Sequence, residues 1–277
     1  MTQDIKTIQQ NILSWYANSG RKLPRRQTRD PYAIHISEVM LQQTQVDRVI
    51  PYFHKRMKDF PDYKTLAKAS KTDLLSHRSG LWFNSRALRL QQCAHELVTK
   101  YKSQVPRTRN ELMNLSWIGP YTSAAIMSFS RNLSVPVIDT NIRRVLIFLF
   151  KLPETITAQA LEAFAETVIP KWKSRDRHNA LMDQWALLLT ARKTRIKPLS
   201  KQSKFEWSDR QVRWWILKQL VKTASLDKGK GTLWGRDLLT IKNIEEEFPY
   251  KEVRKIVKEL QEEGLIQIKK WIISIAE

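Results

Sequence analysis

Apolar residues recur at helical spacing through the first two hundred residues of the chain. Between residues 5 and 18 they stand at Ile5, Ile8, Ile12 and Tyr16, on one face of a helix. A second helix is predicted from Asp30-Pro31, with the Asp as cap, to about Thr44. The same spacing predicts helices over residues 46–58, 65–69, 71–76, 84–101, 109–115, 121–130, 139–149, 157–169 and 177–192. No alternation typical of strands is sustained here, so this part is predicted to be all-α.

The pattern changes after residue 207. Helical spacing over residues 208–223 and short elements over 237–240 and 244–248 precede an amphipathic helix over 249–263. Residues 265–269 and 271–275 then alternate as a two-stranded ribbon. Helices followed by a hairpin predict a winged-helix-like α+β unit, a fold that in some proteins places its third helix in a DNA groove and in others docks to protein.

The charge distribution separates the predicted domains. Residues 191–230 hold 12 Lys and Arg against 3 Asp and Glu, whereas residues 231–277 hold 8 against 9. We therefore predict a helical domain over residues 1–195, a basic linker over 196–207 and a winged-helix-like domain over 208–277. The linker either touches phosphates or is a solvated connector. The nearly neutral charge of the last domain favours docking over DNA binding.

The overall charge is strongly positive. The 277 residues include 48 Lys and Arg against 27 Asp and Glu, a formal net charge of +21. Such a field favours a polyanion, nucleic acid ahead of an anionic membrane surface, although a generally basic proteome would also produce it. With 42% hydrophobic and 27% charged residues, the composition is that of a globular protein.

The sequence lacks features of membrane proteins, secreted proteins and cysteine-based metal proteins. No run of 18 apolar residues predicts a membrane span, and residues 1–10 do not resemble a secretory signal. The single cysteine, Cys93, excludes an intramolecular disulfide and any cysteine-based zinc or iron–sulfur site. We expect a reducing cytoplasm as the compartment.

Three segments carry candidate chemistry. Glu38 lies in a mostly apolar helix within Ser-Glu-Val-Met-Leu-Gln-Gln-Thr-Gln-Val, where burial would raise its pKa; the alternative is a surface Glu. Residues 115–125, with Gly119-Pro120, read as helix, tight turn and helix; such a turn binds phosphate with its amides, or is a plain αα-hairpin. Asp139 follows an apolar, strand-like stretch and starts a helix, where it could be a simple N-cap, an active-site acid or both.

The order and spacing of these segments resemble the helix-hairpin-helix (HhH-GPD) DNA glycosylases, and within them the MutY adenine glycosylases. Leu23-Pro24 followed by Arg26, Asp30-Pro31-Tyr32 and Ala180-Leu181-Met182-Asp183 also match that family, over roughly residues 8–195. The linker and the C-terminal unit resemble a short subgroup without an iron–sulfur cluster. The implied fold is all-α, with a six-helix subdomain over 30–137, a second subdomain from 1–29 and 138–195, and the winged-helix-like unit after them.

The resemblance implies that double-stranded DNA with a mismatch binds and that the target nucleotide is flipped into a pocket. Glu38 would protonate the base and then help water attack, while Asp139 would stay ionised and stabilise an oxocarbenium-like sugar. Tyr121 stands where bifunctional relatives carry a Schiff-base lysine, which implies a monofunctional hydrolase. Tyr121 and Asn141 would support the nucleophile side. The implied base pocket comprises Arg25, Arg26, Leu41 and Asp183, and the implied DNA contacts comprise Gln42, Gln43, Phe83, Trp117, Ile118, Gly119, Tyr121 and Thr122.

Adenine opposite guanine or 8-oxoguanine is the first substrate that the resemblance implies. A G·T or G·U mismatch thymine or uracil glycosylase is the alternative enzyme, and a non-catalytic DNA-binding protein is the alternative from another class. No cofactor is expected, although the hairpin could hold a monovalent cation. We expect a monomer, associated with a bacterial nucleoid and not with a membrane. The domain that reads oxidised guanine in longer relatives is not recognised here, which puts an 8-oxoguanine partner in question.

Glycine and tryptophan occur in unusual numbers. The chain has 7 Gly and 10 Trp, whereas average usage predicts about 19 Gly. The family carries Gly at Trp82, Trp117 and Trp185, and the short subgroup also at Trp172, Trp207 and Trp214. Conversely, relatives carry Trp at Arg25, Arg78 and Arg177. We hypothesise a reassigned genetic code, in which UGA means Gly but was read as Trp, and CGG or CGA means Trp but was read as Arg; genuine drift is the alternative.

Overall fold

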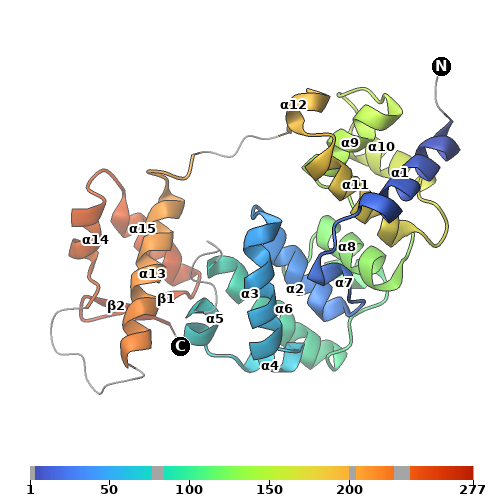
Figure 1. Ribbon diagram of the computed structural model, residues 1–277. Helices are drawn as coiled ribbons and strands as arrows, with labels where there is room; N and C mark the ends of the chain where they lie inside the picture. Colours follow the sequence, from blue (N-terminus) through green and yellow to red (C-terminus); the bar gives the residue numbers. More distant parts are fainter. Residues whose placement is uncertain (1–3, 77–83, 200–203, 228–237, 277) are drawn as a thin grey trace. The chain divides into compact units, whose positions relative to one another are not determined.

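The computed structural model describes residues 4–76, 84–199, 204–227 and 238–276 (Figure 1). By its internal contacts the chain forms two compact units. The first comprises Met1–Val39 and Val105–Lys201, and the second comprises Met40–Gln104 and Gln202–Glu277. The predicted all-α fold with a small C-terminal hairpin is confirmed, because helices dominate the described residues and β1 and β2 are their only named strands.

The first unit is built of helices around one apolar core. Its elements are α1 (Ile5–Ser19), the 3₁₀ turn η1 (Pro24–Arg26), most of α2 (Pro31–Leu41), α7 (Arg109–Met113), α8 (Pro120–Arg131), α9 (Thr140–Phe150), α10 (Ala158–Thr167), α11 (Ser174–Leu187) and α12 (Ala191–Thr194). Helix α11 packs against α1, α8 and α9. The core joins Ile8 and Ile12, part of the predicted apolar face of α1, to Val145, Leu146 and Leu181.

The second unit combines the helices that follow α2 with the C-terminal part of the chain. It contains α3 (Val46–Asp59), α4 (Tyr63–Lys68), α5 (Lys71–Ser76), α6 (Asn84–Tyr101), α13 (Asp209–Asp227), α14 (Ile241–Glu247) and α15 (Val253–Glu262). Strands β1 (Ile266–Lys269) and β2 (Ile272–Ile275) pair antiparallel. Helix α13 packs on α5 as well as on α15. The residues predicted as a winged-helix-like domain therefore share one compact unit with α3–α6.

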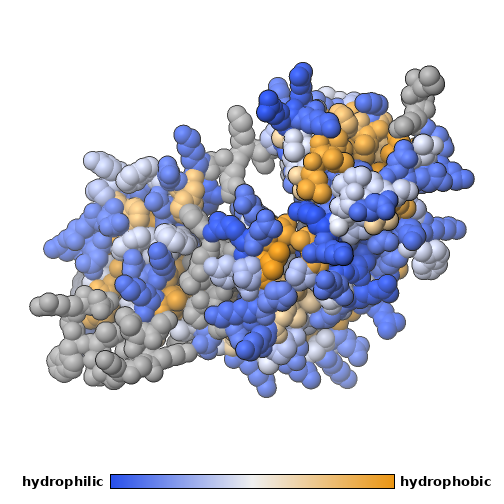
Figure 2. Space-filling view, viewed as in Figure 1, coloured by the Kyte–Doolittle hydropathy of each residue, from blue (hydrophilic) through white to orange (hydrophobic). Residues whose placement is uncertain are grey.

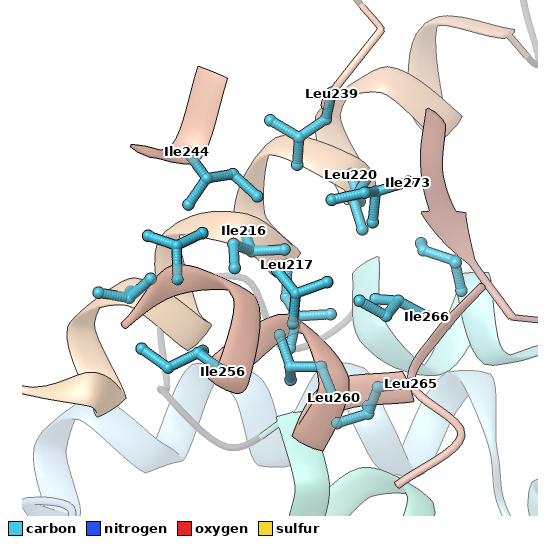
Figure 3. Packing of buried hydrophobic residues seen from close by; sticks show 14 of the residues in the cluster. Ile216, Leu217, Leu220, Leu239, Ile244, Ile256, Leu260, Leu265, Ile266 and Ile273 are labelled. Atoms are coloured by element: carbon cyan, nitrogen blue, oxygen red, sulfur yellow. The ribbon is translucent and has the colours of Figure 1, made fainter. Parts of the chain in front are cut away.

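The core of the second unit explains this packing. Leu75 of α5 is 1% exposed and belongs to the same apolar cluster as the C-terminal helices. Figure 3 shows aliphatic side chains of α13, α15 and the two strands gathered around one centre, and the labelled ones include Ile216, Leu217, Leu220, Ile256, Leu260, Ile266 and Ile273. Hydrophilic residues cover most of the coloured surface in the space-filling view (Figure 2). No described helix has the length and apolar character needed to cross a membrane.

Several predicted element boundaries were wrong, and three of them have a clear local cause. The helix predicted to reach Thr44 ends at Leu41, because the Thr44 amide bonds the Leu41 carbonyl and Gln43 has φ 59°. The helix predicted over 177–192 ends at Leu187, where the amides of Leu188 and Leu189 both donate to the Gln184 carbonyl.

The helix predicted from Pro249 begins only at Val253, because a separate turn closes from the Lys251 amide to the Phe248 carbonyl. The strand-like stretch before Asp139 forms no strand in the described structure. In these cases local hydrogen bonds near the helix ends, which periodicity does not report, determine the boundaries.

Candidate active site

Glu38 is the buried acid of the first unit. It lies in the last turn of α2 and is 2% exposed, as its apolar segment predicted. The Tyr121 hydroxyl donates to its Oε2 at 2.8 Å, and the Arg25 guanidinium donates to its Oε1 at 2.8 Å. Both carboxylate oxygens are therefore engaged, and burial of this acid is compensated by one neutral and one charged donor.

Tyr121 stands at the start of α8, directly after the hairpin. Burial raises the pKa of its phenol well above the usual value, and the nearby charges of Glu38 and Asp139 raise it further. The phenol therefore stays protonated at neutral pH and acts as a hydrogen-bond donor to Glu38. No lysine occupies this place, so Tyr121 cannot form a Schiff base.

Asp139 caps helix α9. Its Oδ1 accepts hydrogen bonds from the backbone amides of Asn141 at 2.9 Å and Ile142 at 2.7 Å. Burial raises the pKa of Asp139, while these two amides act in the opposite direction. Asp139 therefore both caps α9 and lies near Tyr121. Asn141 contributes its backbone amide to the cap.

Arg25 occupies a slot lined by apolar groups. Its guanidinium lies over the Phe129 ring, 5.7 Å from the centroid, and Nη2 is 3.4 Å from the Met182 sulfur. Nε is buried and has no hydrogen-bond partner in the described structure. The Phe129 face attracts this cation, which is 11% exposed, and the ion pair with Glu38 further compensates for its burial.

Arg26 and Asp183, both predicted to line a base pocket, bind each other. Asp183 is fully buried and accepts two bonds from Arg26, each at 2.7 Å, and two from the side chain and amide of Arg21. Burial raises the pKa of Asp183, but the bonds from the two arginines outweigh it and leave the pKa below its usual value. Both carboxylate oxygens of Asp183 accept hydrogen bonds, so Asp183 connects the η1 turn to α11 in this structure. Sequence reasoning missed Arg21, which no motif or periodicity singles out.

The predicted hairpin lies between α7 and α8. Trp117 is 54% exposed at its tip, and Gly119 is the N-cap of α8, with open space where a Cβ would stand. The side chains of Ile118 and Thr122 are 4% exposed. The Ile118 amide already donates to the Leu115 carbonyl at 3.3 Å, so these two residues present little surface to DNA.

The remaining predicted contacts belong to the second unit or lie outside the described residues. Leu41 ends α2, and the exposed Gln42 and Gln43 follow it in a turn held by Arg86, whose Nη1 donates to the Gln42 carbonyl at 2.6 Å. Gln43 has φ 59°, and its Oε1 accepts a hydrogen bond from Arg86 Nη2 at 3.3 Å. Phe83, Trp82 and Arg78 lie outside the described residues.

The donor set does not fit an iron–sulfur cluster. Such a cluster needs four thiolates, and the sequence has only Cys93. Burial raises the pKa of the Cys93 thiol to about 12, so this thiol is an inert core group. Among the described residues no group of His, Cys, Asp and Glu is arranged to hold a metal ion.

Arg177, the largest fully buried side chain of the described structure, lies in α11. It is 1% exposed, and its Nε and Nη2 have no hydrogen-bond partner. Burial lowers the pKa of this guanidinium to about 10. A buried cation with two unsatisfied nitrogens is destabilising, which agrees with the hypothesis that this position is not arginine in nature.

Comparison with known proteins identifies the class. The HhH-GPD superfamily of base excision DNA repair proteins matches residues 36–171, which contain Glu38, the hairpin and Asp139. The adenine DNA glycosylase of Buchnera aphidicola subsp. Baizongia pistaciae is 37% identical over 182 residues, covering 65% of this chain and 52% of that protein. The adenine DNA glycosylase of Mycolicibacterium smegmatis is 36% identical over 194 residues, covering 68% of this chain and 66% of that protein.

The fold is shared with a solved enzyme as well. The structure of a thermostable thymine-DNA glycosylase superposes with a TM-score of 0.65 and 30% identity, covering 68% of this chain and 89% of that one. The chain belongs to the HhH-GPD superfamily of base excision DNA repair proteins. It spans about half to two thirds of the length of the two adenine glycosylases.

Proposed function

We propose that the chain is a monofunctional DNA glycosylase that hydrolyses the N-glycosidic bond of adenine mispaired with guanine or 8-oxoguanine. The observation that carries the proposal is the grouping of Glu38, Tyr121 and Asp139 in one unit, with Glu38 buried and bonded to Tyr121 at 2.8 Å. Two relatives named adenine DNA glycosylase support the choice of base. The protein acts as a monomer on double-stranded DNA, whose backbone binds the hairpin before α8.

The reaction begins when the flipped adenine enters the pocket beside Glu38. The Glu38 carboxyl donates its proton to a base nitrogen, the C1′–N9 bond breaks with its electron pair going to the base, and the sugar becomes an oxocarbenium ion. Asp139 stabilises this cation by its charge, and water adds to C1′ while Glu38 takes up the released proton. Acid–base catalysis of this kind contributes about 10²–10⁴-fold to the rate.

Arg25 conflicts with this role of Glu38. A guanidinium bonded to a carboxylate favours its charged form, whereas a general acid must carry a proton. The residue at position 25 must therefore leave Oε1 when a base enters, or it is not arginine in the natural protein. The unpartnered, buried Nε of Arg25 supports the second explanation, and an indole would also pack against Phe129 and Met182.

A panel of duplexes tests the function. Duplexes containing A·G, A·8-oxoguanine, G·T and G·U are incubated with the wild type and with Glu38→Gln and Asp139→Asn variants, then cleaved with alkali. We expect strand breaks at adenine with the wild type and their loss in both variants. Release of thymine or uracil instead would favour the second candidate, which the likeness to a thymine-DNA glycosylase supports. Binding without any base release would favour a non-catalytic protein.

A further inference from the structure

Tryptophan takes up the left-handed backbone conformation unusually often in this chain. Four of the eight described tryptophans have positive φ: Trp117 at 67°, Trp172 at 59°, Trp207 at 58° and Trp271 at 71°. A bulky residue in this region is a backbone outlier, because its Cβ approaches the neighbouring carbonyl oxygen. Of the three glycines in the described part of the chain, only Gly264 has positive φ.

These four tryptophans share one position in a turn. In three cases the amide after the tryptophan donates to the carbonyl three residues before that amide, which closes a four-residue turn with Trp third. These bonds are Ile118 to Leu115 at 3.3 Å, Lys173 to Pro170 at 3.1 Å and Ser208 to Phe205 at 3.1 Å. Turns with positive φ at the third residue require glycine or asparagine there, because other side chains are strained.

The fourth turn connects β1 to β2. Lys269 pairs with Ile272, so Lys270 and Trp271 form a two-residue hairpin loop. Both have positive φ, 47° and 71°, which is the pattern of a type I′ turn. Glycine is the residue most favoured at the second central position of this turn, and Trp271 occupies it.

The four tryptophans in these turns are mostly exposed. The four side chains are large and apolar, yet they are 54%, 79%, 66% and 82% exposed in chain order. Trp15, Trp185, Trp214 and Trp215, in contrast, lie within helices. Trp215, for example, packs edge-on against Phe248 with ring centroids 5.6 Å apart. The chain thus has two kinds of tryptophan, one packed on helical backbone and one exposed in turns that favour glycine.

We infer that residues 117, 172, 207 and 271 are glycine in the protein that the source cell makes, and that UGA codons at these positions were read as tryptophan. The family resemblance does not imply glycine at position 271, and only the geometry of the hairpin does. For Trp185 and Trp214 the helical backbone supplies no reason for glycine, and Trp82 lies outside the described residues. The inference does not depend on the proposed catalytic function, because it concerns turns in both units.

Two direct readings test the inference. The four codons are read in the genomic DNA, and the corresponding peptides of the protein purified from its own cells are identified by mass spectrometry. We expect UGA at all four positions and glycine in the peptides, with UGG and tryptophan at Trp15 and Trp215. A UGG codon at any of the four turn positions, or tryptophan in its peptide, overturns the inference.

A stability comparison supplies an independent test on the recombinant chain. One variant carries Trp→Gly at all four positions and a matched variant carries Trp→Ala, which removes the same indoles but retains a Cβ at positive φ. We expect the glycine variant to melt above the alanine variant by roughly 2–4 °C per position. Trp215→Gly, in packed helix α13, should lower the Tm. An alanine variant as stable as the glycine variant would contradict the inference.

Discussion

The Tyr121 hydroxyl donates a hydrogen bond to Glu38 Oε2 at 2.8 Å, although the two residues are 83 positions apart in the chain. Tyr121 lies at the start of α8 and Glu38 lies in the last turn of α2, so this bond holds the Glu38 carboxyl against the start of α8. A protonated phenol next to a buried carboxyl orients one of its oxygens and leaves the other for a second partner. In this structure that partner is Arg25.

Removal of this hydroxyl should slow base release without preventing DNA binding. We expect Tyr121→Phe to lower the single-turnover rate of adenine release by roughly 2- to 10-fold, since an ordinary hydrogen bond is worth about 0.5–1.5 kcal/mol. The measurement is single-turnover kinetics on an A·G duplex, alongside the duplex Kd. A Kd that weakens in parallel with the rate would instead indicate a role in binding.

Asp139 can be tested for catalysis separately from capping. Asparagine is as good an N-cap as aspartate, so Asp139→Asn should leave the Tm nearly unchanged while base release is lost. Asp139→Ala should lose base release and also about 1 kcal/mol of stability through the missing cap. Thermal melting and the glycosylase assay on both variants check this. An Asn variant that retains activity would remove Asp139 from the reaction.

The raised pKa of Asp139 adds an acid limb to the pH profile of that assay. Because the carboxylate must be charged to stabilise the sugar cation, the rate should fall as the pH drops through this raised pKa.

Substitution of Arg25 should increase activity, which is unusual for a residue in contact with a catalytic acid. Arg25→Trp and Arg25→Met both remove the guanidinium that occupies Glu38 Oε1, and we expect a rate roughly 10-fold above that of the chain with Arg25. Arg25→Lys, which retains the charge, is the matched control and should give no increase. A decrease with Trp and Met alike would show that the cation itself is required.

Trp117→Gly should strengthen DNA binding through the hairpin. Glycine permits both the positive φ of this position and a close approach of the backbone to phosphate. We expect a lower Kd for the duplex and a steep fall in affinity with salt concentration, since phosphate contacts dominate the binding of a chain of net charge +21. Fluorescence anisotropy at several salt concentrations measures both. Trp117→Ala, with its Cβ, should recover less affinity.

Two buried histidines should make the first unit sensitive to acid. Burial lowers the pKa of His35 to about 4, and burial with the charge of Arg177 lowers that of His178 to about 3. In the unfolded chain these groups bind protons near pH 6.5, so the unfolded state is favoured as the pH falls below that value. Each histidine should therefore remove about 1.4 kcal/mol of unfolding free energy per pH unit below about 6.5.

Urea unfolding at pH 7, 6 and 5 measures this slope. His178→Gln, whose side chain cannot ionise, should roughly halve it, and the double variant with His35→Gln should nearly abolish it. The exposed His54 serves as the matched control, because His54→Gln should leave the slope unchanged. A slope that persists in the double variant would assign the acid sensitivity to other groups.

The helices of this fold follow from the local pattern, but the contacts of the site do not. Apolar spacing predicted α1, α9 and α11 as elements, because a helix that buries one face repeats every 3.6 residues. The catalytic roles proposed for Glu38, Tyr121 and Asp139 were predicted from their motifs. The bond between Glu38 and Arg25 joins residues 13 positions apart, and the bonds of Asp183 to Arg26 and Arg21 join residues 157 and 162 positions apart. Nothing in one segment encodes its partner in another.

The sequence alone determined the helical character, the positive charge, the single cysteine and the family motifs, because these depend on composition and on short-range order. Its count of 7 Gly against 10 Trp also indicated that some turns carry tryptophan where glycine is expected. Only the tertiary structure decided which tryptophans stand in turns, since φ is imposed by how neighbouring elements meet. It likewise decided that Arg25 lies against Glu38, because the packing of the η1 turn and α2 brings Arg25 Nη1 to 2.8 Å from Glu38 Oε1.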